Sequence, residues 1–148
     1  MDIRFNGIIQ REALSAEECR DRLRQARWAR LLISVQCLPA SRPVPLAVAG
    51  EILLVATDEV AVWEAAERHE VLTLNIDGME ASGVTWTVTT TGVGSVVDHR
   101  ASDETLPENH PLLPYLAYGA RLIALPLTLV AGDQTVWSFP GSPALAPE

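Results

Sequence analysis

The side chains that could carry chemistry in this chain exclude several enzyme classes by their type and spacing. All eleven residues counted as lysine or arginine are arginines. Without a lysine, the chain can form neither a Walker A phosphate loop nor a Schiff base with pyridoxal phosphate. The histidines His69, His99 and His110 form no HxH pattern and no pair four residues apart, so the sequence does not predict a metal site. A serine hydrolase is not predicted either, because no GxSxG segment occurs.

The arginines are unevenly distributed along the chain. Residues 1–30 hold seven arginines and five acidic residues, whereas the remaining 118 residues hold four arginines and fourteen acidic residues. The opening segment could therefore be an anion-binding element. It could also be a solvated helix face, since Glu18 and Arg22 have the spacing of an i,i+4 ion pair, and we favour this interpretation for most of these arginines. The net charge of −8 argues against nonspecific binding to nucleic acid.

The composition predicts one packed domain, with 48% hydrophobic and 20% charged residues in a chain of 148. Cys19 and Cys37 form no CxxC pair, which favours free thiols over a disulfide scaffold. The N-terminus lacks the apolar run of a signal peptide, and the apolar stretch at 122–131 is too short to cross a bilayer. We therefore expect a soluble cytoplasmic protein. Residues 1–139 are expected to form the domain and residues 140–148 a flexible tail.

Two helices are predicted from their start signals and apolar spacing. Ser15 has the properties of an N-cap, with a glutamate three residues later that completes a capping box, so a helix is expected at about 15–28. A second helix is expected at 58–68, with Thr57 or Asp58 as its cap.

The rest of the chain predicts a mainly β fold. Gly50 supplies the positive φ of a hairpin turn, and Gly132 begins another turn. Pro39 and Pro43 predict a loop, because a central strand does not accept two prolines in five residues. Strands are expected at 33–37, 44–48, 52–56, 72–76, 84–97 with interruptions at Gly92 and Gly94, 123–129 and 136–139. The pattern is typical of a six-stranded antiparallel β-barrel with Greek-key-like connections and short helices.

Three segments and the order of the elements carry a family resemblance. The segment from Ser82 to Gly94 resembles a GWSV…GxA strand, residues 29–31 resemble a GRL strand start, and residues 50–57 resemble a hairpin and third strand. In these features, residues 14 to about 132 resemble the pyridoxamine 5′-phosphate oxidase-like FMN-binding split barrels. The resemblance implies a split barrel, a homodimer with its cofactor cleft between subunits, and FMN or a deazaflavin for redox chemistry on a small molecule.

Several positions that are polar in this family are apolar in this chain. Ala56 stands where the family commonly has an arginine, Val62 where it has a lysine and Ala47 where it often has an asparagine, while Thr57 is retained. A phosphate needs donors, and buried phosphate charges without cationic partners are costly. The alternative function is therefore a non-catalytic split-barrel homodimer that has lost flavin binding and binds another ligand or a protein partner.

The candidate cofactor-binding residues are Arg30, Thr57 and Trp86, and no catalytic residue is assigned. Arg30 could contact the flavin phosphate, or it could complement the C-terminal end of the first helix. Thr57 is the polar position that matches the family pattern. Trp86 could pack in the core or lie beside the isoalloxazine ring. A row of hydroxyls is expected on one face of a strand, from Thr85, Thr87, Thr89 and Thr91. These hydroxyls could line a ligand groove, or they could face solvent or a second subunit.

Overall fold

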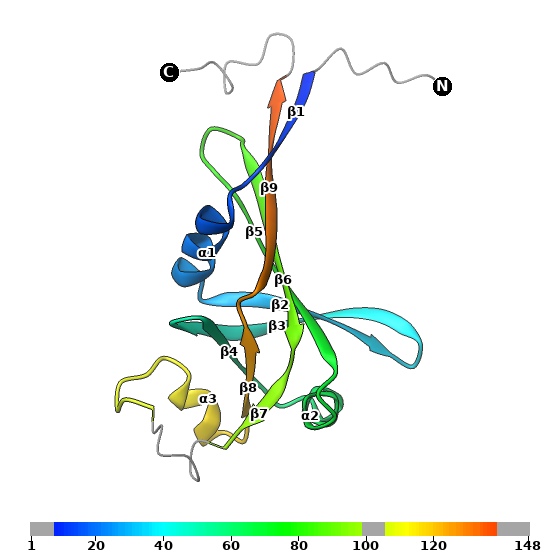
Figure 1. Cartoon of the computed structure of the whole chain (residues 1–148), viewed down its shortest axis with the longest axis vertical. Coiled ribbons are helices and arrows are strands. Elements are labelled where there is room, and N and C mark those ends of the chain that lie inside the picture. The colour runs from blue at the N-terminus through cyan, green and yellow to red at the C-terminus, as the bar shows by residue number, and fades with distance from the viewer. Residues whose placement is uncertain (1–7, 99–105, 139–148) are drawn as a thin grey trace.

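The computed structural model describes residues 8–98 and 106–138, which form a β-barrel with three helices (Figure 1). The strands are β1 (Ile8–Ala13), β2 (Trp28–Val35), β3 (Leu38–Ala49), β4 (Ile52–Thr57), β5 (Val71–Met79), β6 (Thr85–Val93), β7 (Ser95–Val97), β8 (Arg121–Pro126) and β9 (Leu129–Ser138). The helices are α1 (Ala16–Gln25), α2 (Val60–Glu67) and α3 (Leu113–Ala117).

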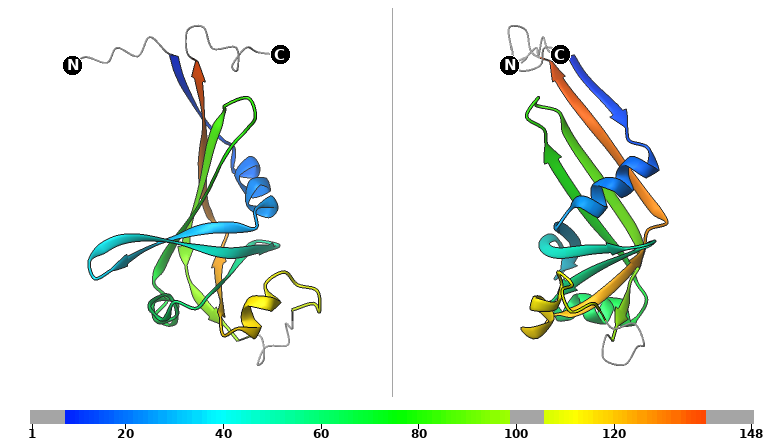
Figure 2. Two further views of the ribbon diagram at one scale, coloured as in Figure 1. Left: turned by 180° about the vertical axis from the view of Figure 1, so that it is seen from behind. Right: turned by 90° about the vertical axis from the view of Figure 1, so that its left-hand side faces the viewer.

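The strands form one sheet in the order β1-β9-β6-β5-β2-β3-β4-β8-β7, and every pairing is antiparallel. β7 follows β6 after Gly94, and β9 follows β8 after two residues, so each pair forms one interrupted strand. Because β6 pairs with β9 and β7 with β8, these interrupted strands close the sheet on itself. The structure thus has nine strands rather than six, but with each interrupted pair counted as one strand its wall is the predicted kind of antiparallel barrel, and β1 is added outside it, along β9 (Figure 2).

Three prolines lie inside β3, where the sequence predicted a loop at 39–43. Leu46 donates its N–H to Arg27 O on the β2 side at 3.0 Å, so the residues at odd positions direct their N–H groups away from β2. Pro39, Pro43 and Pro45 occupy these odd positions. β4 pairs with β3 only from Leu46 onward, so the prolines remove no ladder hydrogen bond. The loop prediction was wrong because this part of β3 has a free edge.

The predicted N-cap of α1 is confirmed, since Ser15 Oγ accepts a hydrogen bond from Glu18 N at 3.1 Å. The predicted helix at 15–28 was too long, because the chain turns to extended backbone at Ala26 and Trp28 already pairs with β3. α2 begins at Val60 rather than at 58, because the preceding residues complete β4 and a turn. In both places, a neighbouring strand or turn takes residues that the sequence assigned to the helix, so each helix is shorter than predicted.

Gly132 lies within β9 and not in the predicted turn. A Cβ atom at this position would lie 2.6 Å from Thr87 O and 2.9 Å from Cys19 Sγ, so glycine is needed where α1 packs closely on the sheet. Gly50, in contrast, has φ +61° and forms the predicted hairpin turn between β3 and β4.

Two apolar clusters stabilise the barrel. Alternate residues of β4 point to opposite sides, so Leu53 and Val55 lie in the interior cluster while Leu54 and Ala56 lie in an outer cluster. α3 and the segment before it cover the outer cluster through Leu112 and neighbouring residues. The expected strand at 52–56 is thus present as β4, an apolar strand covered on both faces.

None of the helices in the described residues has the length and apolar character needed to cross a bilayer. The predicted tail at 140–148 lies outside the described residues.

Candidate functional site

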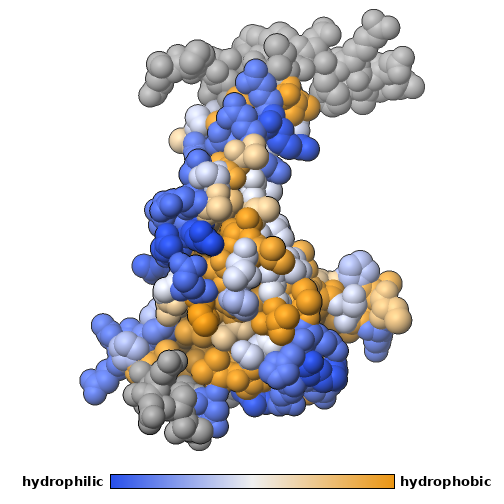
Figure 3. Space-filling model, viewed as in Figure 1, coloured by the Kyte–Doolittle hydropathy of each residue, from blue (hydrophilic) through white to orange (hydrophobic). Residues whose placement is uncertain are grey.

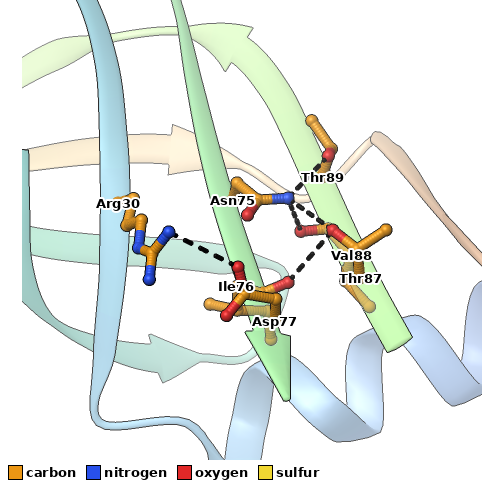
Figure 4. A network of polar contacts seen from close by, with 7 residues as sticks. All are labelled: Arg30, Asn75, Ile76, Asp77, Thr87, Val88 and Thr89. Carbon is orange, nitrogen blue, oxygen red and sulfur yellow. Dashed lines mark hydrogen bonds and ion pairs between the residues drawn. The ribbon is translucent and has the colours of Figure 1, made fainter. Parts of the chain in front are cut away.

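Arg30 lies on the outer face of the barrel, where β2 pairs with β5. Its guanidinium forms an ion pair with Asp77, with 3.6 Å between Nη1 and Oδ2, and its side chain is exposed (Figure 4). The neighbouring Asn75 donates hydrogen bonds to the hydroxyls of Thr87 at 2.7 Å and Thr89 at 3.1 Å. The threonine row of β6 is therefore bonded within the sheet, on the same outer face as Arg30.

Trp86 points the other way, toward α1. The guanidinium of Arg22 lies 4.3 Å from the centre of the Trp86 ring, a cation–π arrangement. On the opposite strand, a Cβ atom at Gly78 would lie 2.5 Å from the ring, so glycine leaves the space that the indole fills. Trp86 packs against the interior cluster, as its predicted structural role requires.

Thr57 is buried at the end of β4, where it holds the turn into α2. Its hydroxyl accepts a hydrogen bond from Glu59 N at 3.1 Å, and its carbonyl accepts one from Trp63 Nε1 at 2.7 Å. Arg42 of β3 reaches the same turn, and its Nε lies 2.9 Å from Glu59 Oε1. The three predicted site residues thus lie in three different environments. Beside Thr57, the structure places Arg42, a cationic residue that was not among the predicted site residues.

A cavity of about 360 Å³ opens beside Thr57, and we call it the aromatic pocket. Three aromatic side chains line it, from β2 and from the segment of α3: Trp28, Tyr115 and Tyr118. Its polar lining is Arg42, Thr57, Asp58 and Glu59. Trp28 is 53% and Tyr118 93% exposed, so large aromatic surface faces solvent here. Exposed aromatic surface around a concavity is typical of a binding site.

A second cavity of about 740 Å³ adjoins the first, and we call it the arginine pocket. Both pockets include Trp28, Pro45 and Tyr115 in their walls. The charged residues that line the arginine pocket are Arg24 and Arg27. Three other cavities in the described part of the chain each have at least one carboxylate in their lining. The arginine pocket is therefore suited to an anion.

His110 also lines the arginine pocket, from the segment that leads into α3. Its Nδ1 accepts a hydrogen bond from Leu112 N at 3.2 Å. Burial lowers the pKa of His110 below its ordinary value, which favours the neutral ring. With Nδ1 as the acceptor, the neutral ring carries its proton on Nε2 and keeps one donor.

The apolar substitutions of the family pattern have structural roles. Ala56 is 2% exposed and lies in the outer cluster beneath α3, and Val62 lies in the interior cluster. Ala47 packs against the outer cluster and forms part of the wall of the arginine pocket. A cation at Ala56 or Val62 would have to replace core packing.

Most of the residues that line the two pockets are not predicted by the sequence. Arg42 and Tyr115 are far apart in the chain, and no local pattern connects them. The excess of arginine in residues 1–30 was the one available signal, since Arg24 and Arg27 belong to that segment. Among the described residues, no group of three or more His, Cys, Asp and Glu side chains could hold a metal ion.

Comparison with known proteins identifies relatives over most of the chain. A family model described as pyridoxamine 5′-phosphate oxidase matches residues 15–114. An FAD-binding protein from Mycobacterium smegmatis has 18% identity and a TM-score of 0.60, covering 84% of this chain and 98% of its own. An FAD-binding protein from Mesorhizobium loti has 16% identity and a TM-score of 0.64, with 84% and 97% covered. A flavocytochrome from Azotobacter vinelandii has 14% identity and a TM-score of 0.61, with 92% and 72% covered. No curated protein matches the sequence at a significant level.

Proposed function

Because the chain belongs to the pyridoxamine 5′-phosphate oxidase family, we propose that it binds a flavin nucleotide in the aromatic pocket and acts as an oxidoreductase on a small molecule. The observation that carries the proposal is the pocket itself. Trp28, Tyr115 and Tyr118 surround a space beside the one polar residue, Thr57, that matches the family's flavin-binding pattern. Two structural relatives are described as FAD-binding proteins, which supports the same ligand class.

The lining of the aromatic pocket fits an isoalloxazine ring. Flat aromatic side chains stack on or meet the edge of such a ring, and they do so with little loss of conformational entropy. Removal of exposed Trp28 and Tyr118 surface from water would add a hydrophobic contribution. A bound flavin would supply the hydride chemistry, and the chain would supply the orientation of the ring and the exclusion of water.

Arg42 supplies the positive charge of this pocket. It is already paired with Glu59, which orients the guanidinium at the rim. The charge beside a flavin ring is one means by which proteins adjust its reactivity. We therefore assign Arg42 an electrostatic role near the ring.

A titration of riboflavin and FMN, followed by flavin fluorescence, tests the proposal. We expect saturable binding by the wild-type protein and at least tenfold weaker binding of both ligands by Tyr118→Ala, because this exposed tyrosine contributes a wall of the pocket. Trp137→Phe is the matched control, since Trp137 lines a different cavity on the outer face. Equal affinities in wild type and Tyr118→Ala would place the flavin elsewhere.

The burial of Ala56 and Val62 favours a second function, a non-catalytic homodimer that binds another ligand in the same pockets. This alternative predicts a folded protein that binds none of riboflavin, FMN and FAD. The same titration therefore separates the two functions.

We further propose that the protein is a homodimer through the outer face of β5, β6 and β9. Exposed apolar side chains lie on this face at Val71, Val93 and Leu129. Figure 3 shows a hydrophobic area over the middle of the molecule, beside the hydrophilic surface of α1. A second copy would bury this area. Sedimentation should show a dimer at micromolar concentration and a larger monomer fraction in Leu129→Glu, whereas a wild-type monomer would refute the proposal.

A further inference from the structure

The aromatic pocket has an unfavourable charge for the phosphate of a flavin nucleotide. Its lining includes two carboxylates, Asp58 and Glu59, and one guanidinium, Arg42. Arg42 is paired with Glu59, with 2.9 Å between Nε and Oε1, so the second carboxylate, Asp58, leaves the lining with a net negative charge. The buried positions Ala56 and Val62 offer no donor. A phosphate placed at the end of β4 would thus meet net negative charge.

The arginine pocket has the opposite charge, although the whole chain carries a net charge of −8. Arg27 forms no ion pair with any residue that the structure describes, and its side chain is exposed. Arg24 pairs with Asp21 at 2.8 Å, and Asp21 is not part of the pocket wall. Arg27 lies beyond the C-terminal end of α1, and its guanidinium is available to a ligand because it has no ion-pair partner among the described residues. Arg24 lies in the last turn of α1, where its positive charge also complements the helix dipole.

The two pockets adjoin at the aromatic pair Trp28 and Tyr115, which belongs to both walls. A ligand with an aromatic ring in one pocket and an anionic group in the other would contact this pair along its length. Ala47 and His110 also belong to the wall of the arginine pocket. These features place a cationic subsite next to an aromatic one.

We propose that the arginine pocket is the phosphate subsite of the flavin nucleotide, with Arg27 and Arg24 as its cationic ligands. This inference rests on the proposed flavin binding. It places the phosphate at the C-terminal end of α1, whereas the family pattern would place it at the end of β4, next to α2. The ligand class is a phosphate or diphosphate attached to a planar aromatic group.

The ratio of riboflavin affinity to FMN affinity tests the subsite, because the two ligands differ in the phosphate. At low ionic strength, we expect FMN to bind at least about tenfold more tightly than riboflavin, as for one hydrogen bond to a charged group. Arg27→Gln should bring the ratio close to one and leave riboflavin affinity unchanged. Arg42→Gln and Arg30→Gln are the matched controls and should keep the ratio. All three arginines are at least partly exposed, so the variants are expected to fold.

Three results would overturn the subsite while flavin binding itself stands. The first is an unchanged ratio in Arg27→Gln. The second is loss of the ratio in Arg42→Gln, which would place the phosphate in the aromatic pocket. The third is loss of the ratio in Arg30→Gln, which would place it on the outer face.

If neither flavin binds, the proposed function fails, and inorganic pyrophosphate then tests the subsite by itself. Calorimetric binding of pyrophosphate to wild type that is at least tenfold weaker in Arg27→Gln, and unchanged in Arg30→Gln, would support an anion subsite in the arginine pocket. Absence of pyrophosphate binding, or equal binding by all variants, would overturn it.

Discussion

The ring of Trp28 meets the ring of Tyr115 edge to face, with 5.9 Å between the ring centres and 89° between the planes. This contact joins the first residue of β2 to α3, and the two pockets lie on either side of it. The position of α3 therefore determines the aromatic wall that the two pockets share.

Removal of this aromatic pair should destabilise the fold and change the pockets. We expect Tyr115→Leu to lower the free energy of unfolding by about 1 kcal/mol, because an edge-to-face pair contributes about 0.5–1.5 kcal/mol beyond its buried area. Urea denaturation measures the change. Tyr118→Leu is the control and should remain within about 0.5 kcal/mol, because Tyr118 is 93% exposed. A double-mutant cycle with Trp28→Leu that gives no coupling would contradict the contact.

Restoration of the family's arginine at position 56 should damage the protein. Ala56→Arg would place a large charged side chain among Leu54, Leu112 and Leu122, so we expect a loss of about 3 kcal/mol or more in the free energy of unfolding. Val60→Arg is the control, since Val60 is exposed on α2. If Ala56→Arg is as stable as wild type, α3 does not cover this face in solution.

Gly78 should tolerate no side chain while Trp86 is present. Gly78→Ala would bring a methyl group to 2.5 Å from the indole, so we expect a loss of about 1–3 kcal/mol, as for overpacking. The smaller side chain of Trp86→Leu should relieve the clash, so the two changes together should cost less than the sum of the single changes. Additive effects in thermal or urea denaturation would show that the ring does not cover Gly78.

His110 should make stability depend on pH below about 6.5. Its pKa is lowered in the folded protein by burial, so the unfolded chain binds more protons in the window between the lowered pKa and the ordinary value of 6.5. The contribution of His110 is thus fully present above pH 6.5 and is lost as the pH falls through this window.

The variant His110→Asn tests this dependence, because asparagine does not titrate and its oxygen can accept the Leu112 N–H two residues on. We expect the urea midpoint of unfolding to fall more steeply in wild type than in the variant as the pH is lowered from 7 to below the lowered pKa of His110. The carboxylates titrate equally in both proteins, so the difference between the two curves reports His110 alone. Parallel curves would show that His110 is not buried as a neutral ring.

Local signals predicted much of the fold. The N-cap at Ser15, the turn at Gly50 and the strand at 52–56 each depend on a few neighbouring residues, and each is confirmed. The prolines of β3 and the position of Gly132 in β9 could not be predicted in the same way. They depend on which strand edge is free and on where α1 packs, and both are set by contacts between distant segments.

The site was predicted only in part for the same reason. Thr57 could be identified as the polar position that matches the family pattern, and it does line a pocket. Arg42, Tyr115 and Tyr118 come together through the hairpin of β3 and β4 and the docking of α3, so neither spacing nor residue type connects them. Arg27 belongs to the excess of arginines in residues 1–30, for most of which the sequence favours a solvated helix face.

The absorbance spectrum of the purified protein after addition of FMN and gel filtration tests the central claim most directly. We predict that flavin absorbance elutes with the protein at up to one flavin per chain, and that this absorbance is lost in Tyr118→Ala and retained in Trp137→Phe. Elution of a folded wild-type protein without flavin, after incubation with riboflavin, FMN or FAD, would contradict the account and favour the non-catalytic homodimer.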